Sequence, residues 1–185
     1  MSNLSKMILT QFEHEDQSHL IDVIREKGIE GKAGVLGTSF ATEYRPWRAG
    51  SDVFEKVRIE LTKRIREIMG DDDLWVSRDL WGLDYEDDEY TCPHKHVVAK
   101  LNAVWYLQAD EGSGKLNYVD PDIVITPRTN MLVIASADWT HFVTANEKSN
   151  VLRTCIPMNI HSMKDIRSNT SQFRFINNEG QYQLD

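Results

Sequence analysis

The feature that most constrains the fold is a series of short apolar segments in the second half of the chain. Segments rich in valine, isoleucine, leucine and aromatic residues run from residue 73 to residue 160, and turn-forming stretches such as EDDE, DEGSG and TPRTN separate them. β-branched and aromatic residues favour strands, whereas Gly, Pro, Asn and Asp favour turns. Many short strands without intervening helices predict a sandwich or barrel, and they argue against a parallel α/β sheet.

Residues 1–70 are predicted to be mostly helical. The apolar residues within 20–24 cluster on one face of a short helix, and Gly28 follows as a stop signal. A second helix is expected to begin at a cap formed by Ser51 or Asp52 and to end at Gly70. Its apolar positions follow spacings of three and four residues, and they are Phe54, Val57, Leu61, Ile65 and Ile68.

Length, charge and cysteine content bound the class of protein. The 185 residues, of which 41% are hydrophobic, fit one domain over 1–185, with helical support at 1–70, a β core at 71–162 and a polar tail at 163–185. We expect no membrane span and no signal peptide. Cys92 and Cys155 are expected to be free thiols in a reducing cytoplasm. The net charge of −8 argues against nucleic acid as a partner.

Three histidines are candidates for metal binding. His94 and His96 are two residues apart, so on an extended strand both side chains point to the same face. Such a pair suits a first-row metal ion, and a pair of surface histidines at a strand end is the alternative. His141 follows His94 by 47 residues, after another apolar segment.

Arg153 is the candidate for binding an anion. Alternation along residues 150–160 places Arg153, Cys155, Pro157 and Asn159 on one strand face and mainly apolar residues on the other. An arginine that faces the interior needs a partner, because an unpaired buried charge is costly. A dicarboxylate ligand would pair with the guanidinium through two hydrogen bonds. The alternatives are a protein carboxylate or exposure to solvent.

The order of these segments resembles the 2-oxoglutarate and iron(II)-dependent oxygenases, most closely a small group found in marine bacteria and their phages. The resemblance covers residues 81–160 and includes His-x-His, LNAVWYLQ, GSGKLNYVDP, TPRTNMLVIASADWTHFV and RTCIPMNI. It implies a double-stranded β-helix, which is a cupin-like jelly roll, with helices packed on one side. Two departures from the family pattern are Asn102 in place of a small residue and Cys155 in place of a serine.

The resemblance also implies roles for individual residues. His94 and His141 match two iron ligands, and Arg153 matches the residue that pairs with the remote carboxylate of 2-oxoglutarate. Asn102, Tyr106 and Asn159 are assigned to the same cofactor-binding set, although Tyr106 also suits a core position. His96 is expected to be the third metal ligand at a position where most members carry Asp or Glu. The carboxylates of Asp120 and Asp138 are the alternative ligands.

The implied activity is a non-haem dioxygenase that uses Fe(II), 2-oxoglutarate and dioxygen to hydroxylate a small molecule or a peptide. The expected location is the cytoplasm, or the host cytoplasm if the source is viral. One alternative is a three-histidine cupin-type dioxygenase without 2-oxoglutarate, in which Arg153 binds the substrate. The other is a non-catalytic jelly-roll binding protein or phage-associated protein, because this fold carries many functions.

Overall fold

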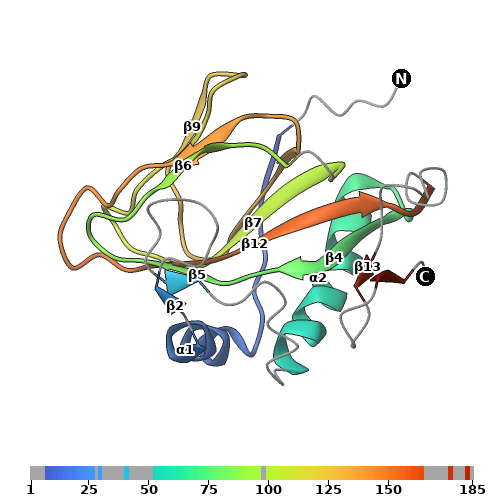
Figure 1. Ribbon diagram of the computed structural model, residues 1–185, viewed down its shortest axis with the longest axis horizontal. Helices are drawn as coiled ribbons and strands as arrows, with labels where there is room; N and C mark the ends of the chain where they lie inside the picture. The colour runs from blue at the N-terminus through green and yellow to red at the C-terminus, as the bar shows by residue number, and fades with distance from the viewer. Residues whose placement is uncertain are drawn as a thin grey trace.

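The computed structural model consists mainly of antiparallel strands (Figure 1), and it describes residues 7–27, 29–30, 40–41, 52–96, 99–164, 175–176 and 182–183. The helices within these ranges are α1 (Gln17–Lys27) and α2 (Asp52–Met69). The strands are β1 (Ile8–Gln11), β2 (Ile29–Glu30), β3 (Phe40–Ala41), β4 (Leu74–Leu80), β5 (Leu83–Tyr85), β6 (Thr91–His94), β7 (Leu101–Ala109), β8 (Leu116–Tyr118), β9 (Ile123–Ile125), β10 (Met131–Ser136), β11 (His141–Val143), β12 (Arg153–Ser162), β13 (Phe175–Ile176) and β14 (Tyr182–Gln183).

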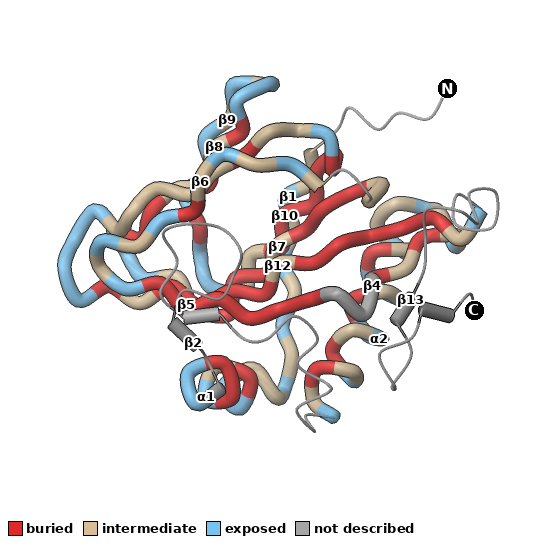
Figure 2. Tube along the Cα trace, viewed as in Figure 1, coloured by how far each residue is buried: buried red, intermediate tan, exposed pale blue. Residues whose placement is uncertain are grey.

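Two main sheets face each other, and β13 and β14 pair separately as a two-stranded sheet. The larger sheet has the order β1-β10-β7-β12-β5-β3-β2, and β4 also pairs with β12. The smaller sheet has the order β6-β11-β8-β9. The buried central strands β7, β10 and β12 lie under the smaller sheet in Figure 2. Two curled antiparallel sheets in this arrangement confirm the predicted jelly-roll class. Most strands between β4 and β12 fall in the apolar segments of the sequence, whereas the short strands β1, β2, β3, β13 and β14 were not predicted.

The two helices cover the outer face of the larger sheet, as Figure 1 shows. In α2 the buried side chains are Phe54, Val57, Leu61 and Ile65, which are four of the five positions predicted from the spacing. Gly70 follows α2 with a φ of 62°, as its place after the helix requires. Ser51 lies outside the described residues. The sequence did not indicate β1, which pairs with β10 at one edge of the sheet.

Strand β12 separates two buried clusters through its alternating side chains. Ile156, Met158 and Ile160 belong to the cluster under the helices. Cys155 belongs to a second cluster, which lies between the two sheets and includes Tyr106. The predicted alternation along this strand is therefore confirmed. The outer face supplies the apolar core, and this leaves the inner face free to carry polar side chains.

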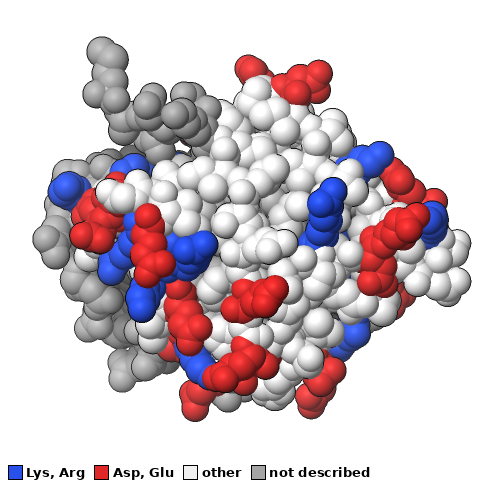
Figure 3. Space-filling model, turned by 180° about the vertical axis from the view of Figure 1, so that it is seen from behind, with Lys and Arg blue, Asp and Glu red and all other residues white. Residues whose placement is uncertain are grey.

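The surface and the helices give two further findings. On the face shown in Figure 3, basic side chains are interspersed with acidic ones and form no continuous basic patch among the described residues. Ion pairs among the described residues include Lys56 with Asp16 and Lys115 with Glu147. No helix within the described ranges is long and apolar enough to cross a membrane.

Candidate functional site

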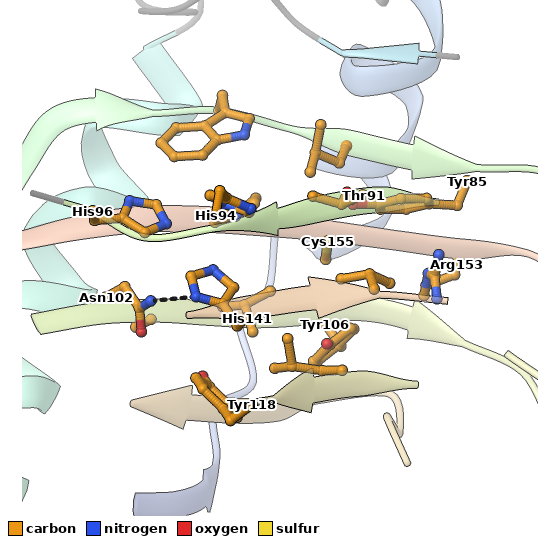
Figure 4. A pocket seen from close by; sticks show the side chains of 17 residues that line it. Tyr85, Thr91, His94, His96, Asn102, Tyr106, Tyr118, His141, Arg153 and Cys155 are labelled. Carbon is orange, nitrogen blue, oxygen red and sulfur yellow. Dashed lines mark hydrogen bonds between the residues drawn. The ribbon is translucent and has the colours of Figure 1, made fainter. Parts of the chain in front are cut away.

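A pocket lies between the two sheets, and most of the predicted site residues line it (Figure 4). Its walls come from the β4–β5 connection and from β5, β6, β7, β8, β11 and β12. The lining residues are Trp81, Leu83, Tyr85, Thr91, His94, His96, Asn102, Ala103, Val104, Tyr106, Leu116, Tyr118, His141, Val143, Arg153, Cys155 and Pro157. The three histidines gather at one end of the pocket, and Arg153 lies at the other (Figure 4).

Strand pairing explains why His94 and His141 meet although 47 residues separate them. β6 and β11 are antiparallel neighbours, and His141 is the direct cross-strand partner of His94. His96 lies two residues beyond the end of β6, where its backbone N–H donates to the Ala137 carbonyl. The ring centroids are 4.4 Å apart for His94 and His141, and 5.2 Å from His96 to each of the others. One nitrogen from each ring lies within 4.8 Å of the other two.

Each histidine ring has its Nδ1 atom hydrogen-bonded to an oxygen. The acceptor for His94 is the Cys92 carbonyl at 2.9 Å, and the acceptor for His141 is the Trp139 carbonyl at 3.0 Å. The acceptor for His96 is the Asn159 side-chain oxygen at 2.6 Å. A carbonyl oxygen can only accept, so these contacts place the proton on Nδ1. The unprotonated Nε2 of each ring is thereby left for a metal ion.

Burial keeps two of these rings neutral. It lowers the pKa of His96 to about 4, and the neighbouring His94 adds to this shift. Burial also lowers the pKa of His141 to about 4, against the opposing effect of its hydrogen bond to Trp139. A metal ion binds neutral imidazole, so both rings are in the binding form at neutral pH without having to release a proton.

Arg153 is fully buried and only partly hydrogen-bonded. Its Nη1 donates to the Gly114 carbonyl at 2.7 Å and to the Thr144 carbonyl at 3.2 Å, and its guanidinium carbon lies 3.9 Å from the centre of the Tyr85 ring. Its Nε and Nη2 atoms are buried without a hydrogen-bond partner. No carboxylate among the described residues forms an ion pair with it. These two N–H groups are therefore positioned to bind an anion.

Gly114 makes room for this guanidinium, and the sequence interpretation missed it. A Cβ atom on Gly114 would lie 2.5 Å from Arg153 Nη1 and 1.9 Å from the Thr144 carbonyl oxygen. The sequence around it, DEGSGKLNY, indicates only a hairpin with a loose pair of glycines. No local sequence pattern could have indicated this role of Gly114. The atoms that crowd it belong to Thr144 and Arg153, which lie 30 and 39 positions further along the chain.

The remaining predicted cofactor-binding residues are distributed along the pocket. Tyr106 lines it and is buried, and burial raises the pKa of its hydroxyl well above the usual value, so the hydroxyl remains a hydrogen-bond donor. The Asn102 amide lies 3.4 Å from His141 Nδ1, at the histidine end. Asn159 is not among the lining residues, because its side chain lies behind His96. The binding roles of all three residues stay predictions.

The two alternative carboxylate ligands lie outside the histidine cluster. Asp120 and Asp138 are both exposed, and neither belongs to a group of possible metal ligands within the described residues. The geometry therefore favours His96 over either aspartate as the third ligand.

Comparisons with known proteins support the fold. No family model matches the chain, and no curated protein matches it in sequence. Solved structures do match. They include the viral collagen prolyl hydroxylase vCPH of Paramecium bursaria Chlorella virus-1 in complex with 2OG, with a TM-score of 0.64 and 13% identity over 85% of this chain and 96% of that one.

Two further solved structures are similar to the chain. The epimerase SnoN of nogalamycin biosynthesis, which is non-heme and α-ketoglutarate-dependent, has a TM-score of 0.62 and 15% identity over 84% of this chain and 78% of that one. Iron-bound HygX of Streptomyces hygroscopicus has a TM-score of 0.60 and 11% identity over 87% of this chain and 84% of that one. At these identities the likeness establishes a shared fold.

Proposed function

We propose that this protein is an Fe(II)- and 2-oxoglutarate-dependent oxygenase that hydroxylates a small molecule or a peptide. One observation carries the proposal. A single pocket has three convergent histidines at one end and, at the other, a buried arginine with two nitrogens, Nε and Nη2, that have no hydrogen-bond partner. We assign a metal ion to the histidine end and an anion to the arginine end of this one pocket. The similar solved structures, which include an iron-bound protein, a 2OG complex and an α-ketoglutarate-dependent epimerase, support this interpretation.

The histidine cluster fits a divalent first-row metal ion. His94, His96 and His141 would hold it through Nε2, which leaves positions open for other ligands. When bound, Fe(II) together with 2-oxoglutarate and dioxygen supplies an oxidant for an unactivated C–H bond, and succinate and carbon dioxide are released. Three neutral ligands leave the full +2 charge of the ion in place. An anionic cosubstrate can offset part of it.

The opposite end of the pocket fits the remote carboxylate of 2-oxoglutarate. Nε and Nη2 of Arg153 would donate to its oxygens, while Nη1 stays fixed by two backbone carbonyls. The Tyr106 hydroxyl, which burial keeps protonated, is a second donor on the same wall. The apolar residues between the two ends, among them Leu116 and Val143, exclude water from the reacting groups.

The test is turnover of 2-oxoglutarate by the purified protein reconstituted with Fe(II) in air. Succinate should form slowly without any added substrate, because members of this class turn over uncoupled. His141→Ala should abolish succinate formation through loss of the metal. Arg153→Met should raise the Kd for 2-oxoglutarate by about 30-fold or more, the equivalent of at least 2 kcal/mol for a lost charge-assisted pair.

The absence of a carboxylate from the histidine cluster within the described residues favours a second candidate, a three-histidine dioxygenase that needs no 2-oxoglutarate. In that case the metal would bind, but calorimetry would show no 2-oxoglutarate affinity, and Arg153→Met would affect only the binding of a substrate carboxylate. A protein that binds neither metal nor 2-oxoglutarate would be a non-catalytic jelly roll. For either enzyme we place the reaction in the cytoplasm, where a cysteine outside any disulfide, such as the buried Cys155, stays reduced.

A further inference from the structure

Asn159 is separated from the anion end of the pocket. It lies on the same face of β12 as Arg153, but six residues further along, which corresponds to about 20 Å of extended strand. The residue is 7% exposed and is not among the residues that line the pocket. A role in binding the remote carboxylate does not fit this position. Its contact is instead the 2.6 Å hydrogen bond between its Oδ1 and His96 Nδ1.

His96 depends on this contact more than the other two histidines depend on theirs. His94 and His141 donate to the backbone carbonyl two residues earlier, so their own strands orient them. His96 lies past the end of β6, and its Nδ1 partner is a side chain 63 residues away. Strand geometry therefore does not fix the orientation of this ring, and a tertiary contact has to do so.

The surroundings of His96 hold its ring from two directions. The ring stacks between those of Trp81, at 6.2 Å and 21°, and His141, at 5.2 Å and 4°. The stack fixes the plane of the ring but does not decide which edge faces the pocket. The hydrogen bond to the Asn159 oxygen sets which edge faces the pocket. The oxygen accepts the proton of Nδ1, and Nε2, on the opposite edge of the ring, is thereby turned towards the other histidines.

The register of the central strands adds a second asparagine beside the first. Asn102 on β7 is the direct cross-strand partner of Asn159 on β12. Asn102 lies 3.4 Å from His141 Nδ1, so one amide lies behind each of the two stacked rings. Because His141 Nδ1 donates its proton to the Trp139 carbonyl, it cannot also accept a hydrogen bond from the Asn102 amide, whereas Asn159 Oδ1 is the Nδ1 partner of the His96 ring.

We propose that Asn159 is the positioning residue of the metal site: it fixes the tautomer and orientation of His96 and thereby makes this imidazole a third ligand. The inference rests on the proposed function, because it assumes that the three histidines bind metal. It reassigns Asn159 from cosubstrate binding to the support of one ligand. Removing such a supporting group lowers metal affinity by about 10- to 100-fold in known sites.

The test is Co(II) affinity, measured by titration calorimetry on the metal-free full chain. Asn159→Leu keeps the branched shape and the number of side-chain heavy atoms but removes the acceptor, and it should raise the Co(II) Kd by about 10- to 100-fold. Asn159→Asp keeps an acceptor and should bind Co(II) at least as tightly as the wild type. The matched control is Asn117→Leu on β8. Its amide donates to the Lys115 carbonyl at 2.9 Å, and its alternation with Tyr118 points it away from the pocket.

A double-mutant cycle separates positioning from a general structural role. In a His96→Ala background, Asn159→Leu should change the Co(II) Kd by less than about twofold, because its effect passes through His96. A similar loss with and without His96, or an unchanged Kd in the single variant, would overturn the proposal while leaving the metal site intact. If the wild type binds no Co(II), the proposed function fails as well.

A spectroscopic readout covers the case in which Asn159→Leu folds poorly. In the Zn(II)-loaded wild type, proton NMR should show a slowly exchanging Nδ1 proton for each hydrogen-bonded ring. Asn159→Asp should retain the His96 resonance and shift it, because a charged acceptor strengthens the hydrogen bond. A His96 resonance that is the same in the wild type and in Asn159→Asp would contradict the proposal.

Discussion

Replacing Gly114 with alanine is expected to disable the anion end of the pocket while sparing the histidine end. Gly114 precedes β8, and its carbonyl accepts a hydrogen bond from Arg153 Nη1 at 2.7 Å. An added Cβ would lie 1.9 Å from the Thr144 carbonyl oxygen, 2.6 Å from that of Ala145 and 2.5 Å from Arg153 Nη1. Two of these three atoms are backbone, so a side-chain rotation cannot relieve the crowding. Either the chain segments separate or the guanidinium withdraws.

The size of the effect follows from two contributions. Overpacking a tight site costs about 1–3 kcal/mol, and a lost hydrogen bond to a charged group costs about 1.5–3 kcal/mol. The two overlap, since one displacement produces both, so we expect the free energy of unfolding to fall by about 2–5 kcal/mol. For a chain of this size that lowers the Tm by about 5–15 °C. Because the displaced guanidinium is the proposed carboxylate ligand, the Kd for 2-oxoglutarate should rise at least about tenfold.

The assay pairs thermal unfolding with calorimetric titration of 2-oxoglutarate into Co(II)-loaded protein. Gly112→Ala is the matched control in the same turn. There the φ of 95° makes alanine strained, but the nearest atoms to a new Cβ belong only to the flexible Lys148 side chain. It should lose about 1–2 kcal/mol of stability and keep its 2-oxoglutarate affinity. The reasoning is refuted if Gly114→Ala binds 2-oxoglutarate like the wild type, or if Gly112→Ala weakens binding equally.

Three further predictions concern charge and protonation. Because burial lowers the pKa of His96 and His141 from 6.5 to about 4, the unfolded state binds more protons between these values. The free energy of unfolding of the metal-free protein should therefore fall as the pH drops from 6.5 to 4, by up to about 3 kcal/mol per histidine. Chemical denaturation at a series of pH values measures this fall, which should be smaller in His141→Gln. Bound metal and bound 2-oxoglutarate should each raise the protein's affinity for the other by the same factor, and titrations in both orders measure this factor. If the coupling arises at the metal, Arg153→Met should leave the factor nearly unchanged. The Cys155 thiol, whose pKa burial raises to about 12, should react with iodoacetamide only after unfolding, as peptide mass mapping would show.

The sequence predicted the β half of the fold well, because the pattern there is local. With the exception of β6, whose sequence TCPH is mostly polar, each strand from β4 to β12 begins within an apolar segment bounded by turn residues. The amphipathic period of α2 identified four of its buried positions. β1 escaped notice because Ile8–Gln11 contains only two strongly apolar residues, and pairing with β10 rather than local preference makes it a strand.

The histidine cluster was predictable in membership but not in geometry. Period 2 correctly suggested that His94 and His96 converge, although His96 lies beyond the strand that the argument assumed. The hydrogen bond from His96 to Asn159 joins residues 63 positions apart, so no local pattern contains it. The same holds for Gly114, whose significance depends on which carbonyls and which guanidinium the fold brings against it. Their roles as ligands and supports stay predictions until metal binding is measured.

The pattern of hydrogen bonding across the inner face indicates where the ligand belongs. Most buried polar side chains there have partners on a neighbouring segment, such as Tyr85 with Thr91 at 2.6 Å. Two pocket-lining residues within the described ranges retain buried atoms without one: Arg153 through Nε and Nη2, and Asn102 through Oδ1. Native interiors rarely leave such groups unsatisfied. We therefore expect a ligand atom that accepts hydrogen bonds from Nε and Nη2 of Arg153 at one end of the pocket. We likewise expect a hydrogen-bond donor to Asn102 Oδ1 beside the histidines. A hydroxyl-bearing substrate or a water molecule next to the metal would supply it.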